Sequence, residues 1–268
     1  MSQCDGEAGG WKADLALALR LADRADGITL ARFRAADLRV DRKPDRTPVT
    51  DADTATEDAL RAVLAAERPG HAVVGEERGG SVDAGRGWVI DPIDGTKNYS
   101  RGVPVWASLI ALVSDGDPVV GVVSAPALGR RWWASAGGGA WASDASGGEP
   151  RRLAVSGVHE LADACLSTTE LSSWAERGEL DRYLDLVARC WVVRAFGDFW
   201  QHMLVAEGAI DVAIDAEANA WDLAAVQLVV TEAGGRFTDL TGADGFTGGS
   251  GMSSNGPLHA PSLAVLRG

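Results

Sequence analysis

The stretch from Trp88 to Asn98 (WVIDPIDGTKN) constrains this chain more than any other. Its apolar first half predicts a buried strand that ends at Asp91, because Pro92 cannot donate a ladder hydrogen bond and Gly95 permits a tight turn. Such a turn brings the carboxylates of Asp91 and Asp94 toward one point, and two hard anions at one point favour a hard cation. The alternative is an ordinary solvated turn, since Asp, Pro and Gly all favour turns.

The groups beside these carboxylates suit a phosphate. The Ile93 carbonyl is a further oxygen ligand, and the backbone N–H groups of Gly95 and Thr96 can donate to phosphate oxygens. Oxygen ligands beside a phosphate receptacle indicate Mg²⁺. Lys97 adds an ammonium to this receptacle, although it and the upstream Lys43 can equally be solvated charges.

Three further segments carry acidic residues at the ends of predicted elements. They are Pro48–Asp53 (PVTDAD), the pair Glu76 and Glu77, and Trp221–Ala225 (WDLAA), which continues into the sequence EAGG. Taken alone, the glutamate pair can be a solvated strand end, and Asp222 can simply pair with the dipole of a helix N-terminus. Together with Trp88–Asn98, however, these segments resemble the signatures of the inositol-monophosphatase family over nearly the whole chain.

This resemblance implies a metal site. Glu76, Asp91 and the Ile93 carbonyl would hold one Mg²⁺, and Asp91, Asp94 and Asp222 would hold a second. Two such cations clamp the attacking and leaving oxygens of an in-line displacement at phosphorus.

The resemblance also implies the remaining catalytic groups. Water activated by the metal would be the nucleophile, positioned by Thr96 and Glu76, with Asp53 as a further member of this relay. Backbone N–H groups of Gly95 and Thr96 would bind the phosphate. A third, weaker Mg²⁺ is expected near Glu76 and Asp53.

Stretches outside these signatures resemble a subgroup of the family, the actinobacterial enzymes that hydrolyse histidinol phosphate. The stretches are Arg101–Leu112, Val122–Leu128, Arg131–Trp133 and Gly197–Phe199. The expected reaction therefore yields L-histidinol and phosphate, in histidine biosynthesis. Inositol 1-phosphate or another small phosphate ester is the alternative substrate.

Four residues are candidate substrate contacts. Asp215 lies at the position of an acidic polyol contact in the inositol-handling members, and Asp198 and Glu207 can meet the ammonium and imidazole of histidinol phosphate. These acids can equally be surface charges. In the subgroup an Asn near the C-terminus reaches the neighbouring subunit's pocket, and Asn255 matches its context, so a homodimer is implied.

Composition limits the partners. A formal net charge of −13 disfavours nucleic acid, and a small phosphorylated metabolite would need metal ions to offset repulsion. No apolar run is long enough to span a bilayer and no secretory leader is recognised, so we expect neither a membrane nor secretion. Three cysteines without metal-like spacing argue against a disulfide framework and favour a reducing cytoplasm.

Strands and helices alternate along the chain, which favours a mixed α/β (α+β) fold in layers. Helices are predicted near residues 11–34, 53–67, 174–189, 221–233 and 261–266, and 40–50 reads as a loop or short hairpin. The resemblance implies an αβαβα sandwich of the sugar-phosphatase type. We expect one compact unit, with residues 1–155 supplying the meander sheet and metal loop and residues 156–268 completing the site.

Rival functions belong to other classes. A catalytically silent metal- or ligand-binding protein of the same fold would be expected to lose an acidic ligand, and none is lost here. A dinucleotide-binding module is disfavoured, because the glycine clusters at 137–139 and 248–249 lack the G-x-G-x-x-G spacing.

Overall fold

The computed structural model describes residues 10–44, 46–81, 85–144 and 148–268. Its helices are α1 (Lys12–Arg32), α2 (Asp51–Glu67), α3 (Thr96–Ser100), α4 (Leu171–Glu176), α5 (Leu180–Arg189), α6 (Asp198–Ala206), α7 (Ala220–Glu232) and α8 (His259–Arg267). Two short 3-10 helices cover Pro126–Leu128 and Leu161–Asp163. Within these described residues, no helix is long and apolar enough to cross a membrane.

The strands form a hairpin and two sheets. The hairpin pairs β1 (Val40–Arg42) with β2 (Pro48–Thr50). The first sheet runs, in spatial order, β3 (Ala72–Gly75), β4 (Arg86–Asp94), β5 (Ala107–Ser114), β6 (Asp117–Ala125), β7 (Arg130–Ser135), β8 (Gly139–Asp144) and β9 (Arg151–Arg152). The second runs β11 (Val192–Arg194), β10 (Cys165–Thr168), β12 (Val212–Asp215), β14 (Gly251–Ser254) and β13 (Arg236–Thr238).

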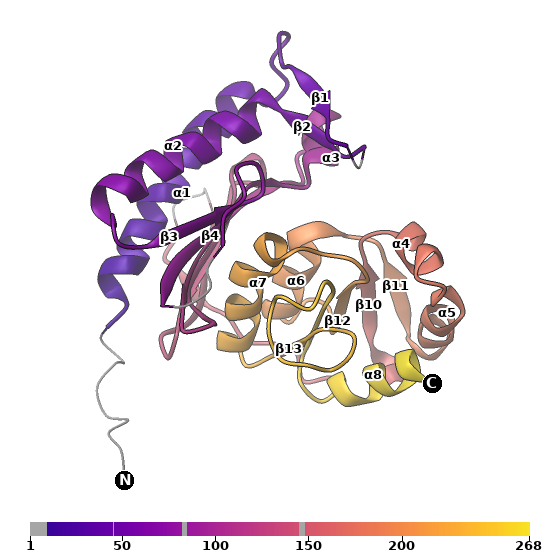
Figure 1. Ribbon diagram of the computed structural model, residues 1–268. Coiled ribbons are helices and arrows are strands. Elements are labelled where there is room, and N and C mark those ends of the chain that lie inside the picture. The colour runs from indigo at the N-terminus through magenta and orange to yellow at the C-terminus, as the bar shows by residue number, and fades with distance from the viewer. Residues whose placement is uncertain (1–9, 45, 82–84, 145–147) are drawn as a thin grey trace.

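The elements stack in five layers (Figure 1). Helices α1 and α2 bury their apolar faces on one side of the first sheet, α6 and α7 lie between the sheets, and α4, α5 and α8 cover the far side of the second sheet. Gly121 lets α7 approach the first sheet closely, since a Cβ there would lie 3.0 Å from the Ala225 carbonyl oxygen. The predicted αβαβα sandwich is confirmed.

Strand β4 departs from the prediction at the stretch that constrains the fold. Instead of turning after Asp91, it continues to Asp94 through a β-bulge, in which Asp91 pairs with Leu109 and Asp94 pairs with Ala107. Pro92 lies inside the bulge, where its missing N–H costs no ladder hydrogen bond. The predicted turn is therefore wrong, and a bulge brings the two carboxylates together.

Two predicted helices also differ in detail. The helix expected over 174–189 is split into α4 and α5, because Gly178 adopts a left-handed conformation with φ of 69°. Helix α2 begins at Asp51, since Thr50 and Asp53 form a capping box around its first turn.

Candidate active site

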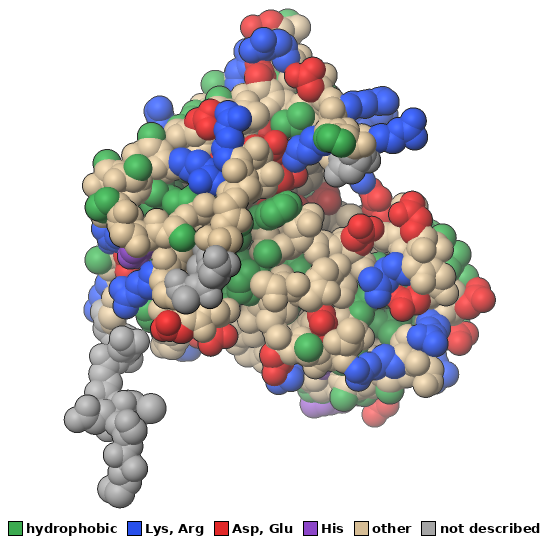
Figure 2. All heavy atoms as spheres, viewed as in Figure 1, with side chains coloured by type: hydrophobic (Ala, Val, Ile, Leu, Met, Phe, Trp, Pro, Cys, Tyr) green, Lys and Arg blue, Asp and Glu red, His purple; other side chains and the backbone are tan. Residues whose placement is uncertain are grey.

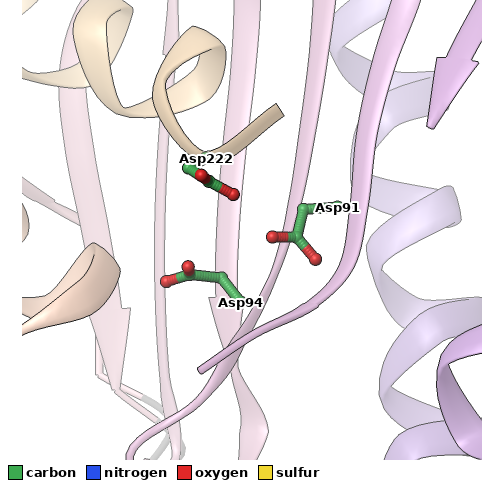
Figure 3. A group of neighbouring side chains, drawn as sticks. All are labelled: Asp91, Asp94 and Asp222. Carbon is green, nitrogen blue, oxygen red and sulfur yellow. The ribbon is translucent and has the colours of Figure 1, made fainter. Parts of the chain in front are cut away.

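Three aspartates meet beside the bulge of β4 (Figure 3). Asp91 and Asp94 come from β4 and Asp222 from the first turn of α7, and one carboxylate oxygen of each lies within 4.8 Å of the others. Asp222 is held there by a capping box, in which the Asn219 N–H donates to its Oδ2 at 2.7 Å. The Ile93 N–H donates to Asp91 Oδ1 at 2.9 Å.

These carboxylates repel one another in a buried setting. Burial raises the pKa of Asp91 well above its ordinary value, and the charges of Glu76 and Asp94 raise it further. Burial also raises the pKa of Asp94 strongly, and that of Asp222 to about 7. None of the ion pairs formed within the described ranges includes any of the three aspartates. Clustered oxygen donors without a protein cation fit a divalent ion such as Mg²⁺.

Glu76 follows β3 and lines the same pocket, although it lies outside the group of three aspartates. Lys43, in the turn of the β1–β2 hairpin, donates to Glu76 Oε1 at 2.6 Å and to Glu77 Oε1 at 2.7 Å. Lys43 is therefore an ion-pair partner of these carboxylates and not a solvated charge. Of the four predicted carboxylate ligands, three converge and the fourth faces them while bound to a lysine.

A buried glutamate that the sequence analysis did not single out fixes this acidic pair. Glu57 in α2 is fully buried and accepts hydrogen bonds from the backbone N–H of Glu77 at 2.7 Å and of Arg78 at 3.1 Å. Gly75 makes this possible, because a Cβ at that position would lie 2.2 Å from Glu57 Oε1. Glu57 thereby sets where the chain carrying Glu76 leaves the sheet.

Thr96 connects Asp53 to the pocket. The Thr96 hydroxyl lies 2.8 Å from the Ile93 carbonyl oxygen and 3.2 Å from Asp53 Oδ1. Asp53 is fully buried, and burial raises its pKa to about 7. Its other oxygen accepts the Thr50 N–H at 2.8 Å. Asp53 thus reaches the pocket through Thr96, and the third Mg²⁺ expected near Glu76 and Asp53 stays a prediction.

The pocket that these groups line has a volume of about 490 Å³ and lies between the two halves of the chain. Acidic side chains gather on both sides of this hollow (Figure 2). Gly95 and Thr96 line it at the start of α3, and Lys97 pairs with Glu170 across it. The carboxylates of its wall are Glu76, Asp91, Asp94, Glu170, Glu176, Asp198, Asp215, Glu217 and Asp222.

Asp198 lines the pocket beside Asp94 and has an unusual backbone. Its φ is 48°, a left-handed conformation that is uncommon outside glycine and tends to occur at functional sites. Asn98 Nδ2 donates to Asp198 Oδ2 at 3.2 Å, and the next N–H, of Phe199, donates to Asp94 Oδ2 at 2.7 Å. Burial, followed by the charge of Asp215, raises the pKa of Asp198 to about 7.

Comparison with known proteins identifies the family. The model of the inositol monophosphatase family matches residues 12–264. The chain belongs to this family. The predicted family is therefore confirmed.

Relatives of this inositol monophosphatase family member include two histidinol-phosphatases. The one from Mycobacterium tuberculosis is 59% identical over 254 residues, covering 94% of this chain and 97% of the relative. The one from Streptomyces coelicolor is 52% identical, covering 94% and 96%. Among solved structures, an inositol monophosphatase from Zymomonas mobilis superposes with a TM-score of 0.84 at 31% identity, covering 97% of this chain and 99% of that chain.

Glu207 does not contact the pocket in this family member. It follows α6, and its Oε1 accepts Arg130 and the Trp132 indole N–H at 2.5 Å each, and Arg151 at 2.8 Å. These three donors tie β7 and β9 to the end of α6. That Glu207 meets the substrate stays a prediction.

Asn255 is likewise occupied within its own subunit. Only 2% of it is exposed, its Nδ2 donates to the Ser156 hydroxyl at 2.9 Å and the Val158 carbonyl at 2.8 Å, and its Oδ1 accepts the Leu258 N–H at 3.3 Å. The side chain therefore caps the turn before α8, and the expectation that Asn255 reaches a neighbouring subunit stays a prediction.

Proposed function

We propose that the protein is a Mg²⁺-dependent phosphomonoesterase that hydrolyses L-histidinol phosphate to L-histidinol and phosphate. One observation carries this proposal: the pocket that holds the three clustered aspartates is also lined by two further acids, Asp198 and Asp215. The first group suits metal and phosphate, and the second suits a cationic leaving group. The names of the two histidinol-phosphatase relatives support the same reaction.

The metal ligands follow from the donor set. Asp91, Asp94 and Asp222 would hold one Mg²⁺, and Asp91, Glu76 and the Ile93 carbonyl a second. When bound, Mg²⁺ lowers the pKa of a coordinated water and stabilises charge on the phosphate and leaving oxygens. Lys43 occupies only Oε1 of Glu76, which leaves Oε2 of that carboxylate for a metal ion.

The remaining groups of the chain orient the reactants. The Thr96 hydroxyl, held by Asp53 and the Ile93 carbonyl, directs the attacking water, and Glu76 or Asp53 takes its proton. Gly95 and Thr96 begin α3, where the first N–H groups have no intrahelical acceptor and are available to phosphate oxygens.

The charge of histidinol fits the carboxylates of Asp198 and Asp215. Its ammonium is positively charged and its imidazole can be protonated, whereas a polyol such as inositol is neutral. A positive charge is attracted to the two carboxylates. The hydroxyls of a polyol can donate hydrogen bonds to these carboxylates, but a neutral polyol gains no attraction between opposite charges. This charge difference is the physical reason for ranking histidinol phosphate above inositol 1-phosphate.

A panel of phosphate monoesters tests the proposal. With Mg²⁺ present, we expect turnover of L-histidinol phosphate to exceed that of myo-inositol 1-phosphate, fructose 1,6-bisphosphate and 3′-phosphoadenosine 5′-phosphate by about tenfold or more in kcat/KM. A tenfold preference for one of the other three esters would show that L-histidinol phosphate is not the substrate. No phosphate release from any of them would favour the silent binding protein.

We also propose a homodimer in a reducing cytoplasm. Trp191, which precedes the edge strand β11, is 75% exposed, and an edge strand offers unpaired backbone groups to a second copy. Light scattering on the wild-type protein and on Trp191→Glu tests this, since a dimer that persists unchanged in the variant would exclude the β11 edge as the contact.

A further inference from the structure

Asp215 is held by three side chains, of which His202 and Gln201 do not line the pocket and Thr169 does. Asp215 ends β12, and its Oδ2 lies 2.7 Å from His202 Nε2. Gln201 Nε2 donates to its Oδ1 at 2.7 Å, and the Thr169 hydroxyl donates to the same oxygen. Thr169 also accepts the Asp198 N–H at 2.9 Å, so one hydroxyl links the Asp215 carboxylate to the backbone of Asp198.

His202 and Gln201 are polar residues in a buried part of the fold. They occupy adjacent positions in α6, are 1% and 0% exposed, and neither lines the pocket. An ionised carboxylate only accepts hydrogen bonds, so His202 carries its hydrogen on Nε2. Its Nδ1 lies 2.7 Å from the Ser253 hydroxyl, which donates to it when the ring is neutral.

The hydrogen bonds to Asp215 fix where its carboxylate lies. Oδ1 accepts the Gln201 amide and the Thr169 hydroxyl, and Oδ2 lies against His202 Nε2. No arginine or lysine pairs with Asp215 among the ion pairs of the described residues. Asp215 is therefore held in one orientation as part of the pocket wall.

We propose that His202 and Gln201 are positioning residues that give the pocket its selectivity for a cationic leaving group, because their hydrogen bonds hold the Asp215 carboxylate in place in the pocket wall. This inference rests on the proposed function. It adds a specificity determinant buried in α6 that never touches the substrate.

The test compares a cationic with a neutral ester. KM and kcat are measured with L-histidinol phosphate and with glycerol 2-phosphate for wild type, His202→Leu and His202→Gln. Leucine removes the donor, whereas glutamine keeps an N–H near the position of Nε2. His259→Gln is the matched control, since His259 is also buried and bonded to hydroxyls, those of Thr238 and Ser254.

We expect His202→Leu to raise KM for L-histidinol phosphate about tenfold or more while kcat on either ester and KM for glycerol 2-phosphate stay within about twofold. His202→Gln should restore most of the loss, and His259→Gln should change neither KM. The affinity of His202→Leu for the product L-histidinol, measured by calorimetric titration, should fall in parallel with the rise in KM. If His202→Leu does not fold, Gln201→Met removes the other donor and should raise the same KM about threefold.

Equal losses on both esters, or an unchanged KM for the cationic one, would overturn the inference while leaving the proposed function intact. A wild-type enzyme that hydrolyses glycerol 2-phosphate as well as L-histidinol phosphate would instead overturn the proposed function, and selectivity for the cation with it. The preference of the wild type for L-histidinol phosphate over glycerol 2-phosphate tests the proposed function, and the change of that preference in His202→Leu tests the inference.

Discussion

Asp222→Asn should stabilise the metal-free protein while it destroys the metal site. In the absence of Mg²⁺, the ionised carboxylate of Asp222 is buried against the charges of its neighbours, and its pKa is raised from 3.8 to about 7. Asparagine has nearly the same shape and carries no charge. Its amide oxygen can still accept the Asn219 N–H that closes the first turn of α7.

The expected gain follows from the pKa of Asp222. Raising a carboxyl pKa from 3.8 to about 7 costs about 1.4 kcal/mol for each pH unit, so the ionised form destabilises the fold by about 4 kcal/mol. The raised pKa is the net result of all interactions of the charged form, including the hydrogen bond from the Asn219 N–H. The free energy of unfolding should therefore rise by about 4 kcal/mol, which raises Tm by about 8 °C.

The stability difference between the wild type and Asp222→Asn should grow as the pH rises. Because the folded-state pKa of Asp222 is raised, the wild type loses stability as pH rises from about 4 to about 7, and the variant does not incur this loss. The difference in Tm between the two proteins should accordingly vanish near pH 4 and be complete above pH 7.

Thermal unfolding in EDTA and in excess Mg²⁺ measures both effects. The wild type should gain stability when Mg²⁺ is added, whereas Asp222→Asn should gain little. Mg²⁺ should therefore reduce or reverse the difference in Tm between the two proteins. Asp239→Asn is the matched control: Asp239 is buried and accepts the Thr241 hydroxyl and the Ala243 N–H, so its loss should lower Tm in both buffers. Asp222→Asn behaving like this control in EDTA would refute the electrostatic reasoning.

Four further predictions concern individual groups. Asp94→Asn should lower kcat on phosphate monoesters by about 10³-fold or more while far-UV circular dichroism stays unchanged; retention of most activity would defeat its assignment as a ligand. Thr96→Val should lower kcat about 10²-fold and Thr96→Ser much less, because the hydroxyl positions the water. Glu207→Gln should leave KM unchanged and lower Tm, since it weakens the pairing with Arg130; a raised KM would restore Glu207 as a substrate contact. Treatment with EDTA should abolish phosphate release and added Mg²⁺ should restore it.

The layers and most site residues were predictable from sequence, because they depend on local patterns. The apolar run ending at Asp91 and the helix opening with Trp221-Asp222 each signal an element and a carboxylate at its end, and these carboxylates converge. The bulge in β4 was not predictable, since Pro92 fits a turn and a bulge equally well. Only the partner strand decides between them.

Residues that depend on tertiary partners were beyond the sequence. The sequence around Glu207 does not show whether its carboxylate faces the pocket. In the structure it pairs with Arg130 and Arg151, which come from other strands. Glu57 looked like one charge among several on α2, although its carboxylate caps the backbone that follows Glu76. The pair Gln201-His202 within an otherwise apolar helix was a signal that could have been read, since buried polar side chains require partners.

We propose that Asp91, Asp94 and Asp222 hold divalent cations, which promote the hydrolysis of the phosphate ester by water. A crystal grown with Mn²⁺ and phosphate, with anomalous scattering recorded at the manganese edge, tests it most directly. We predict anomalous peaks about 2.0–2.3 Å from carboxylate oxygens of all three aspartates, with phosphate beside Gly95 and Thr96. Manganese bound elsewhere, with the three carboxylates bare, would contradict the account.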